Sequence, residues 1–250
     1  MELAIAIGTS LLSARRVRAA AALGLLALAG GSPALAAITH RVTIQPIQVR
    51  RDDGTGAANA GRVLWEGYAD KIWDQAGIDV EFLSWRTLDK TSYLSVDNVA
   101  EFTSLTRDVG NQQHATASVI NMYFVNSQYA DSNEITYGRA WVGGNGIVIS
   151  DPTFSFASGL GRLDTLAHEI GHNLGLSHGG GALRLMADGN VRTIPTALGD
   201  VFPDGVKTDQ LLAGEITTAT GSGFSIAVPT PGSLAILGVS GPIASRRRRG

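Results

Sequence analysis

Three histidines and one glutamate occur in a short run whose spacing suits the binding of one metal ion. The run is His168-Glu169-Ile170-Gly171-His172-Asn173-Leu174-Gly175-Leu176-Ser177-His178. Residues four apart lie one turn above each other on a helix, so His168 and His172 can direct both imidazoles at the same ion. Glu169 is angled away from that ion, where it can take a proton from water. The run therefore predicts a zinc site with a general base beside it.

The third histidine needs a change in chain direction after the helix. A straight helix would point His178 away from the ion, because it lies six residues beyond His172. Gly175 accepts a positive φ, which allows the helix to end and the chain to bring His178 back as third ligand. Three neutral histidines leave an open position at which water becomes acidic near a pH of about 7. This chemistry, with Glu169 as general base, predicts the hydrolysis of a peptide bond.

The elements that must position this run can be read from the spacing of the apolar residues. Leu163, Ala167, Ile170 and Leu174 share one helical face, so the run is expected on a helix whose other face carries the histidines. Strands are predicted over 40–49, 78–83 and 118–125. A hairpin is predicted from 138–142 and 147–150 around a Gly-rich turn at 143–146.

Further helices are expected to cover this sheet, and the connecting segments are expected to be loops. The predicted helices span 63–75, ended by Gly77, then 96–106, beginning near Ser95, and a C-terminal helix near 208–216 that packs against the motif helix. Loops are predicted over 51–61 and 190–206. The order of elements predicts an α/β (α+β) fold: a mixed, twisted sheet with an antiparallel edge strand, covered by helices.

Composition and charge narrow the class of protein further. The chain has 250 residues, a formal net charge of −2 and no cysteine. The absence of cysteine excludes disulfides, thiolate metal sites and an inhibitory cysteine. Arginines gather at both ends (Arg15, Arg16, Arg18 and Arg246 to Arg249), so the body between them is acidic. An acidic body argues against nucleic acid as a partner.

The N-terminal residues have the pattern of an export signal. Basic residues from Arg15 precede an Ala/Leu/Gly run that ends at Ala34-Leu35-Ala36. A basic region, a short apolar region and a small-x-small site are typical of a signal peptide. The apolar run from Ala19 to Gly30 is too short to span a membrane, which argues against the alternative of a membrane helix. Residues 1–36 are therefore predicted to be a signal peptide, and residues 37–227 the catalytic domain.

The C-terminal residues 228–250 have the pattern of a second targeting segment. Val228-Pro229-Thr230-Pro231 precedes a modest apolar stretch and four arginines. This layout resembles the PEP-CTERM sorting tail of Gram-negative bacteria, although Thr230 stands where that tail usually has glutamate. The resemblance implies an exosortase-type partner, membrane contact through the terminal segments only, and a location at the cell surface, in the outer envelope or outside the cell. The alternative is a solvated tail with an arginine run.

The run from His168 to His178 matches the signature His-Glu-x-x-His-x-x-Gly-x-x-His, and the chain resembles the metzincin zinc peptidases. Metzincins place a methionine in a tight turn beneath the zinc. Leu185-Met186-Ala187 looks like this Met-turn, with Met186 as a hydrophobic floor and not a ligand. An ordinary core methionine is the alternative. The resemblance implies a metzincin-like catalytic domain with one catalytic Zn²⁺ and a protein or peptide substrate.

The segment before the motif is similar to the adamalysin/reprolysin branch of the metzincins, with matrixins as the other branch considered. Gly138, Arg139, Ala140, Trp141 and Val142 resemble that branch's edge strand, with which an extended substrate would pair. Two departures limit the assignment of a subfamily. Gly179 stands where adamalysins have aspartate and matrixins serine. Asp188 stands where astacins and serralysins place a tyrosine.

Other polar residues are interpreted more plainly. His40 and His114 are expected to be surface or strand-end histidines. Asp52-Asp53 and the segment 131–134 are oxygen-rich, which leaves Ca²⁺ binding as an alternative, but solvated loop acids are the favoured interpretation. Two functions are compatible with the whole pattern: a secreted zinc endopeptidase, and a surface or matrix protein that binds zinc without proteolysis. The presence of Glu169 favours the first.

Overall fold

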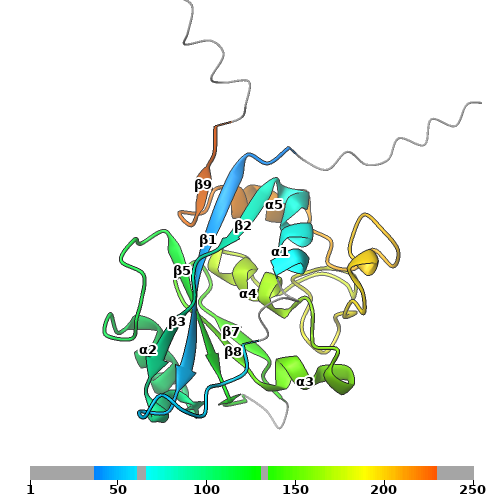
Figure 1. Ribbon diagram of the computed structural model, residues 1–250. Coiled ribbons are helices and arrows are strands. Elements are labelled where there is room, and N and C mark those ends of the chain that lie inside the picture. The colour runs from blue at the N-terminus through cyan, green and yellow to red at the C-terminus, as the bar shows by residue number, and fades with distance from the viewer. Residues whose placement is uncertain (1–36, 61–65, 131–134, 230–250) are drawn as a thin grey trace, which may run out of the picture. The chain divides into compact units, whose positions relative to one another are not determined.

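The sheet predicted from the sequence is present in the computed structural model, which describes residues 37–60, 66–130 and 135–229. Its strand order is β2-β1-β5-β8-β7 (Figure 1). The bounds are β1 His40–Arg50, β2 Ile78–Phe82, β5 Val119–Val125, β7 Gly138–Ala140 and β8 Ile147–Ser150. Strands β2, β1, β5 and β8 are parallel to their neighbours, whereas β7 pairs antiparallel with β8. The mixed sheet with an antiparallel strand at its edge is confirmed.

Strand β1 organises the sheet because it pairs with four other strands along its length. Its first half pairs with β2, and its second half pairs in parallel with β3 (Arg86–Asp89). On the other side it pairs with β5 and, antiparallel, with β9 (Ser225–Ala227). Neither β3 nor β9 is predicted from the sequence, because both are too short to show a clear alternation of apolar and polar residues. Two further short strands, β4 (Ser95–Val96) and β6 (Ser127–Gln128), pair with each other.

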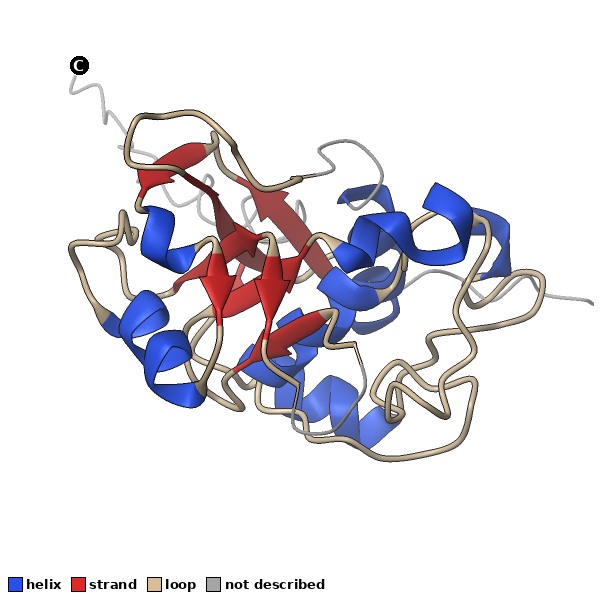
Figure 2. Ribbon diagram, turned by 90° about the horizontal axis from the view of Figure 1, so that it is seen from below, coloured by secondary structure: helices blue, strands red, loops and turns tan. Residues whose placement is uncertain are grey.

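Helices cover both faces of the sheet (Figure 2). Alternate residues of β5 explain the two layers: Met122 belongs to a core with α1 (Glu66–Trp73) and α4 (Thr165–Asn173), whereas Tyr123 belongs to a core with α2 (Val99–Arg107). All seven residues of β5 are buried, which is expected of a strand covered on both faces. The layer with α1 and α4 positions the histidine motif.

Two of the predicted helices begin elsewhere than expected. Helix α2 begins at Val99, where the side chain of Asn98 accepts a hydrogen bond from the Glu101 N–H, because Ser95 and Val96 are taken up in strand β4. The C-terminal helix α5 spans Ala213–Thr220 instead of 208–216. Asp209 has a φ of 58°, which a right-handed helix excludes. Helix α5 packs against β9 and the 3₁₀ turn after α1, and its Thr218 lies near Gly175 at the end of the motif helix.

The remaining elements are short. Helix α1 continues into the 3₁₀ turn η1 (Asp74–Ala76) and ends at Gly77 with a φ of 65°, as predicted. Helix α3 (Pro152–Gly159) and the 3₁₀ turns η2 (Thr91–Tyr93) and η3 (Leu198–Asp200) lie in segments for which no helix is predicted. No helix among the described residues is long and apolar enough to cross a membrane. The predicted signal peptide, residues 61–65 and 131–134, and the tail beyond Pro229 lie outside the described residues.

Candidate metal centre

Helix α4 carries the first two histidines and the glutamate, and all three side chains are buried. Ala167 and Ile170 of this helix are buried in the core, together with Leu163 just before it and Leu174 at its C-cap. The helix ends as the sequence predicts, because Gly175 adopts a φ of 97°. The N–H groups of Gly175 and Leu176 donate to the carbonyls of His172 and Gly171, both at 2.9 Å. The chain then turns back toward the helix.

The turn brings His178 to the other two histidines. Its Nε2 lies 3.1 Å from Nε2 of His168 and 3.1 Å from Nε2 of His172. Tetrahedral zinc with Zn–N bonds of 2.0–2.1 Å holds its nitrogen ligands about 3.3 Å apart, so the three atoms fit one zinc ion. No other group of three potential ligands of this kind occurs in the part of the chain that the structure describes.

Backbone carbonyls orient two of the imidazoles. Nδ1 of His168 donates to the carbonyl of Leu185 at 2.7 Å, and Nδ1 of His172 donates to that of Leu176 at 2.8 Å. These bonds leave each Nε2 as the metal-facing atom. Burial lowers the pKa of both histidines, and the Arg192 charge lowers that of His168 further. Both imidazoles are therefore neutral near pH 7 and available to a cation.

The methionine turn lies below the ligands. The Ala187 N–H donates to the Arg184 carbonyl at 3.2 Å, which closes a turn around Met186. Met186 is fully buried and directs its sulfur against Gly171 of helix α4. The same turn supplies the Leu185 carbonyl that orients His168. The segment thus packs against helix α4 and holds the His168 imidazole in position.

Glu169 lies between the histidines and the edge strand β7. A Cβ on Gly138 would be 2.6 Å from Oε1 of Glu169, so only glycine allows the strand to approach the carboxylate this closely. Burial raises the pKa of Glu169 to about 7, against the opposing charges of Arg192, Arg139 and Arg162. A carboxylate that takes and returns protons near neutral pH is suited to general acid–base chemistry.

Hydrogen bonds hold the β7–β8 hairpin against the end of helix α4. Nδ2 of Asn173 donates to the Trp141 carbonyl at 2.9 Å, and the Gly143 N–H donates to the His172 carbonyl at 2.8 Å. These contacts set the distance between β7 and the ligands. The predicted edge strand 138–142 is too long by two residues. Trp141 leaves the strand because its Nε1 donates to Thr106 Oγ1 at 2.9 Å, and Val142 is exposed.

Three buried ionisable side chains behind His168 are not predicted from the sequence, because they form no local pattern. Arg192 Nε lies 2.6 Å from Asp164 Oδ2, and its Nη1 contacts His168 Nδ1 and donates to the Leu185 carbonyl at 3.1 Å. Asp209 is also fully buried, and burial and Asp164 raise its pKa to about 8. These residues come from three distant parts of the chain, so no spacing rule could group them. Together they tie the start of α4 to the methionine turn.

The remaining candidates stay outside the ligand set. Asp188, which follows the methionine turn, places Oδ2 3.9 Å from His178 Nδ1 at the exposed rim. His40 Nδ1 hydrogen-bonds Thr39, and His114 Nδ1 accepts from the Thr116 N–H. Asp52 and Asp53 bond Thr91 and Thr55, so nothing in this loop indicates calcium.

The comparison with protein families agrees with this geometry. Residues 65–179, from helix α1 to just past His178, match the family described as Metallo-peptidase family M12B Reprolysin-like. The matched segment contains the edge strand and all three histidines. The chain is a zinc metallopeptidase. Its metal centre takes one catalytic Zn²⁺, held by the three converging imidazoles.

Solved structures with similar folds are remote from this metallopeptidase. The archaemetzincin from Archaeoglobus fulgidus, crystallised with malonate, has a TM-score of 0.40 and 18% identity over 71% of this chain and 99% of its own. A zinc-dependent peptidase from Methanocorpusculum labreanum has a TM-score of 0.41 and 12% identity, over 70% of this chain and 98% of its own. Metalloproteinase-II from Bacteroides fragilis has a TM-score of 0.46 and 16% identity, over 75% of this chain and 54% of its own. No curated protein matches the chain.

Proposed function

We propose that this metallopeptidase is an endopeptidase in which Glu169 is the general base and His168, His172 and His178 hold the zinc. The observation that carries the proposal is the position of Glu169, which lines the same cavities as the three histidines and places its carboxylate against Gly138 of β7. When bound, the zinc ion polarises the scissile carbonyl and acidifies the attacking water. Glu169 accepts the proton of that water and passes it to the leaving nitrogen, which balances the hydrolysis.

Strand β7 supplies the track for the substrate. It ends the described sheet on this side, and its residues are only partly buried, so its outer edge can pair with an added strand. A cavity of about 480 Å³ runs past β7, Val142, His172 and Ser177 to Glu169. A peptide lying antiparallel to β7 would place its scissile bond next to Glu169 and continue on both sides. A binding groove that is open at both ends suits cleavage within a polypeptide chain.

We further propose that the enzyme is exported and retained at the cell envelope. The support is the sequence of residues 1–36 and 228–250, with their signal-like and PEP-CTERM-like patterns and the implied exosortase partner. Val228, the first residue of the tail, donates its N–H to the Thr39 carbonyl at 2.8 Å. Fractionation of a Gram-negative host, with residues 228–250 deleted as the control, tests this location.

Hydrolysis of casein and of an unbiased peptide library tests the enzymatic proposal. We expect cleavage by the full chain that a chelator abolishes and zinc restores. Glu169→Gln is expected to keep the zinc and lower kcat/KM by about 10²- to 10⁴-fold, the usual contribution of a general base. Equal zinc content without cleavage of any peptide would favour a binding protein instead. Cleavage that survives both the chelator and Glu169→Gln would show that another site is responsible.

A further inference from the structure

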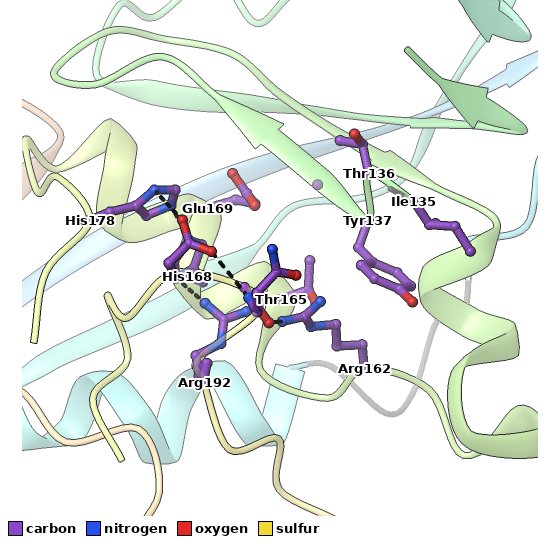
Figure 3. A pocket seen from close by; sticks show the side chains of 13 residues that line it. Ile135, Thr136, Tyr137, Arg162, Thr165, His168, Glu169, His178 and Arg192 are labelled. Carbon is purple, nitrogen blue, oxygen red and sulfur yellow. Dashed lines mark hydrogen bonds and ion pairs between the residues drawn. The ribbon is translucent and has the colours of Figure 1, made fainter. Parts of the chain in front are cut away.

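A second cavity of about 170 Å³ adjoins the metal centre and is polar at its base. Figure 3 shows Arg162 and Arg192 extending into it from two sides, below His168 and Glu169. Both arginines are buried, with exposed fractions of 7% and 8%. Buried arginines beside a catalytic centre are costly unless anions compensate them. The two arginines differ in whether a carboxylate of the protein lies close enough to compensate their charge.

Arg192 is compensated within the protein. Its Nε lies 2.6 Å from the fully buried carboxylate of Asp164. Its Nη1 donates to the Leu185 carbonyl. This arginine has a structural role, and its charge is largely neutralised by Asp164.

Arg162 has no such partner among the described residues. Its Nη2 donates to the Gly189 carbonyl at 2.9 Å, its guanidinium lies 4.7 Å from the centre of the Tyr137 ring, and its buried Nε has no hydrogen-bond acceptor. No carboxylate of the described residues lies within ion-pair distance of it. Burial and then the Arg192 charge lower the pKa of Arg162, and the more distant charges of Asp164 and Glu169 offset this shift only in part. An anion arriving in the cavity would relieve both penalties.

Strand direction indicates which part of a substrate enters this cavity. Both cavities reach Thr136 and Gly138, at the start of β7. The larger one extends from there to Ala140 and Val142, at the far end of the strand, whereas the smaller one extends to Ile135 and Arg162. A peptide antiparallel to β7 runs from Val142 toward Thr136. The residue that follows the scissile bond therefore reaches the Arg162 side. Asp188 also lines this cavity but stays at the exposed rim, bonded to the Asn190 N–H and near His178.

Resting on the endopeptidase proposal, we infer that Arg162 makes this cavity a subsite for a carboxylate on the residue directly after the scissile bond. The carboxylate would be the side chain of glutamate or aspartate, or the terminal carboxylate of a substrate that ends there. Two planar N–H donors of a guanidinium match a carboxylate in either case. Arg162 is thus a specificity-determining residue, and the substrates are acidic at this position.

Paired peptides test the inference. The first pair of peptides is derived from a library sequence that the enzyme cleaves, and both peptides have a blocked C-terminus. One carries glutamate and the other glutamine directly after the scissile bond. A second pair ends at this residue as a free acid or an amide. We expect kcat/KM to favour at least one acid over its neutral partner by about 10- to 100-fold, the usual range for a hydrogen-bonded charge. The pair that responds identifies the source of the carboxylate.

Arg162→Gln separates specificity from catalysis. It is expected to bring the ratio of kcat/KM between the acidic and the neutral peptide down to about one, whatever its effect on the cleavage of both. Arg107→Gln is the matched control, since Arg107 also lies over an aromatic ring, 4.8 Å from Trp141, but outside this cavity. Arg162→Lys keeps the charge and should keep part of the preference. Equal loss on both peptides, or no acid preference in the wild type, would overturn the inference.

The subsite can be examined without turnover. Peptide hydroxamates that ligate zinc and carry glutamate or glutamine at the same position are compared by calorimetry on zinc-loaded wild type and Arg162→Gln. We expect about tenfold or tighter binding of the acid, lost in the variant. If no peptide is cleaved, the endopeptidase proposal fails, and the hydroxamate pair still decides the role of Arg162. Equal binding of both hydroxamates to the wild type contradicts that role.

Discussion

Helix α4 and the segment that follows it, residues 176–212, contribute to the same metal centre by different means. The helix presents His168, Glu169 and His172 from a regular backbone, with an apolar face buried in the core. The segment 176–212, which we name the ligand loop, contains only the short 3₁₀ turn η3 within its described length. Individual hydrogen bonds and buried ionisable side chains hold this loop in place, and the loop in turn positions His178 and Met186. A ligand on the helix is therefore held by local structure, whereas a ligand on the loop depends on distant contacts.

Zinc removal should separate the two regions most clearly. The ion joins His178 of the ligand loop to two histidines of α4, so its loss frees the loop while leaving the helix in its core. We expect chelation to abolish hydrolysis and to speed amide exchange at least about tenfold in residues 177–190. Residues 166–173 should change little. Hydrogen exchange followed by mass spectrometry provides the measurement, and uniform acceleration in both regions would show that the comparison is wrong.

Arg192→Met should cause the largest loss of stability among single changes in the ligand loop. It leaves the fully buried Asp164 without its cation, which costs about 3–5 kcal/mol in the free energy of unfolding. Adding Asp164→Asn removes the orphan charge and should return at least about 1 kcal/mol of this loss. Urea unfolding measures both.

The exposed pair Arg50–Asp89 gives the control for this prediction. Its atoms lie 2.7 Å apart, but the side chains remain 29% and 42% exposed. Arg50→Met should therefore cost at most about 1 kcal/mol. If Arg50→Met and Arg192→Met are equally destabilising, burial of the Arg192–Asp164 pair has no special role.

Met186 tests how tightly the loop packs against the helix. Met186→Ala removes a fully buried side chain beneath α4 and should cost about 2–5 kcal/mol. Met186→Leu keeps the volume and should cost less than about 1.5 kcal/mol, with the zinc affinity unchanged. Thermal unfolding and zinc titration distinguish packing from ligation. A large loss of zinc affinity in the leucine variant would indicate a direct role for the sulfur.

Asp209 should make the stability of the protein depend on pH. Its pKa is raised to about 8 in the folded protein, above the ordinary value of 3.8. The folded state therefore holds one more proton between these values, and its stability falls as pH rises, by at most about 1.4 kcal/mol per unit. The contribution should level off above pH 8.

Asp209→Asn isolates this effect. Asparagine tolerates the positive φ of 58° at this position and cannot titrate. The difference in unfolding free energy between wild type and variant, measured from pH 5 to 9, should show the slope described. A difference that does not change with pH would mean that Asp209 keeps an ordinary pKa.

Much of the fold was predictable because periodicity is a local property. The spacing of apolar residues located β1, β2, β5, the hairpin and α4, since each has enough residues to show its period. It misplaced α2 and α5, where a strand pair at Ser95 and a positive φ at Asp209 override the helical pattern. Strands β3 and β9 were not predicted, because they are short and form only by pairing with β1, which is distant in the sequence.

The sequence by itself determined the metal, its three ligands and the adjacent carboxylate, because these residues lie within one helix and one glycine-ended turn. Only the tertiary structure decided what surrounds them. Arg192, Asp164 and Asp209 meet behind His168, and Arg162 is buried beside the metal without a carboxylate partner among the described residues. These contacts join segments far apart in the chain. Their energies come from burial and mutual distance, which no local spacing of residues encodes.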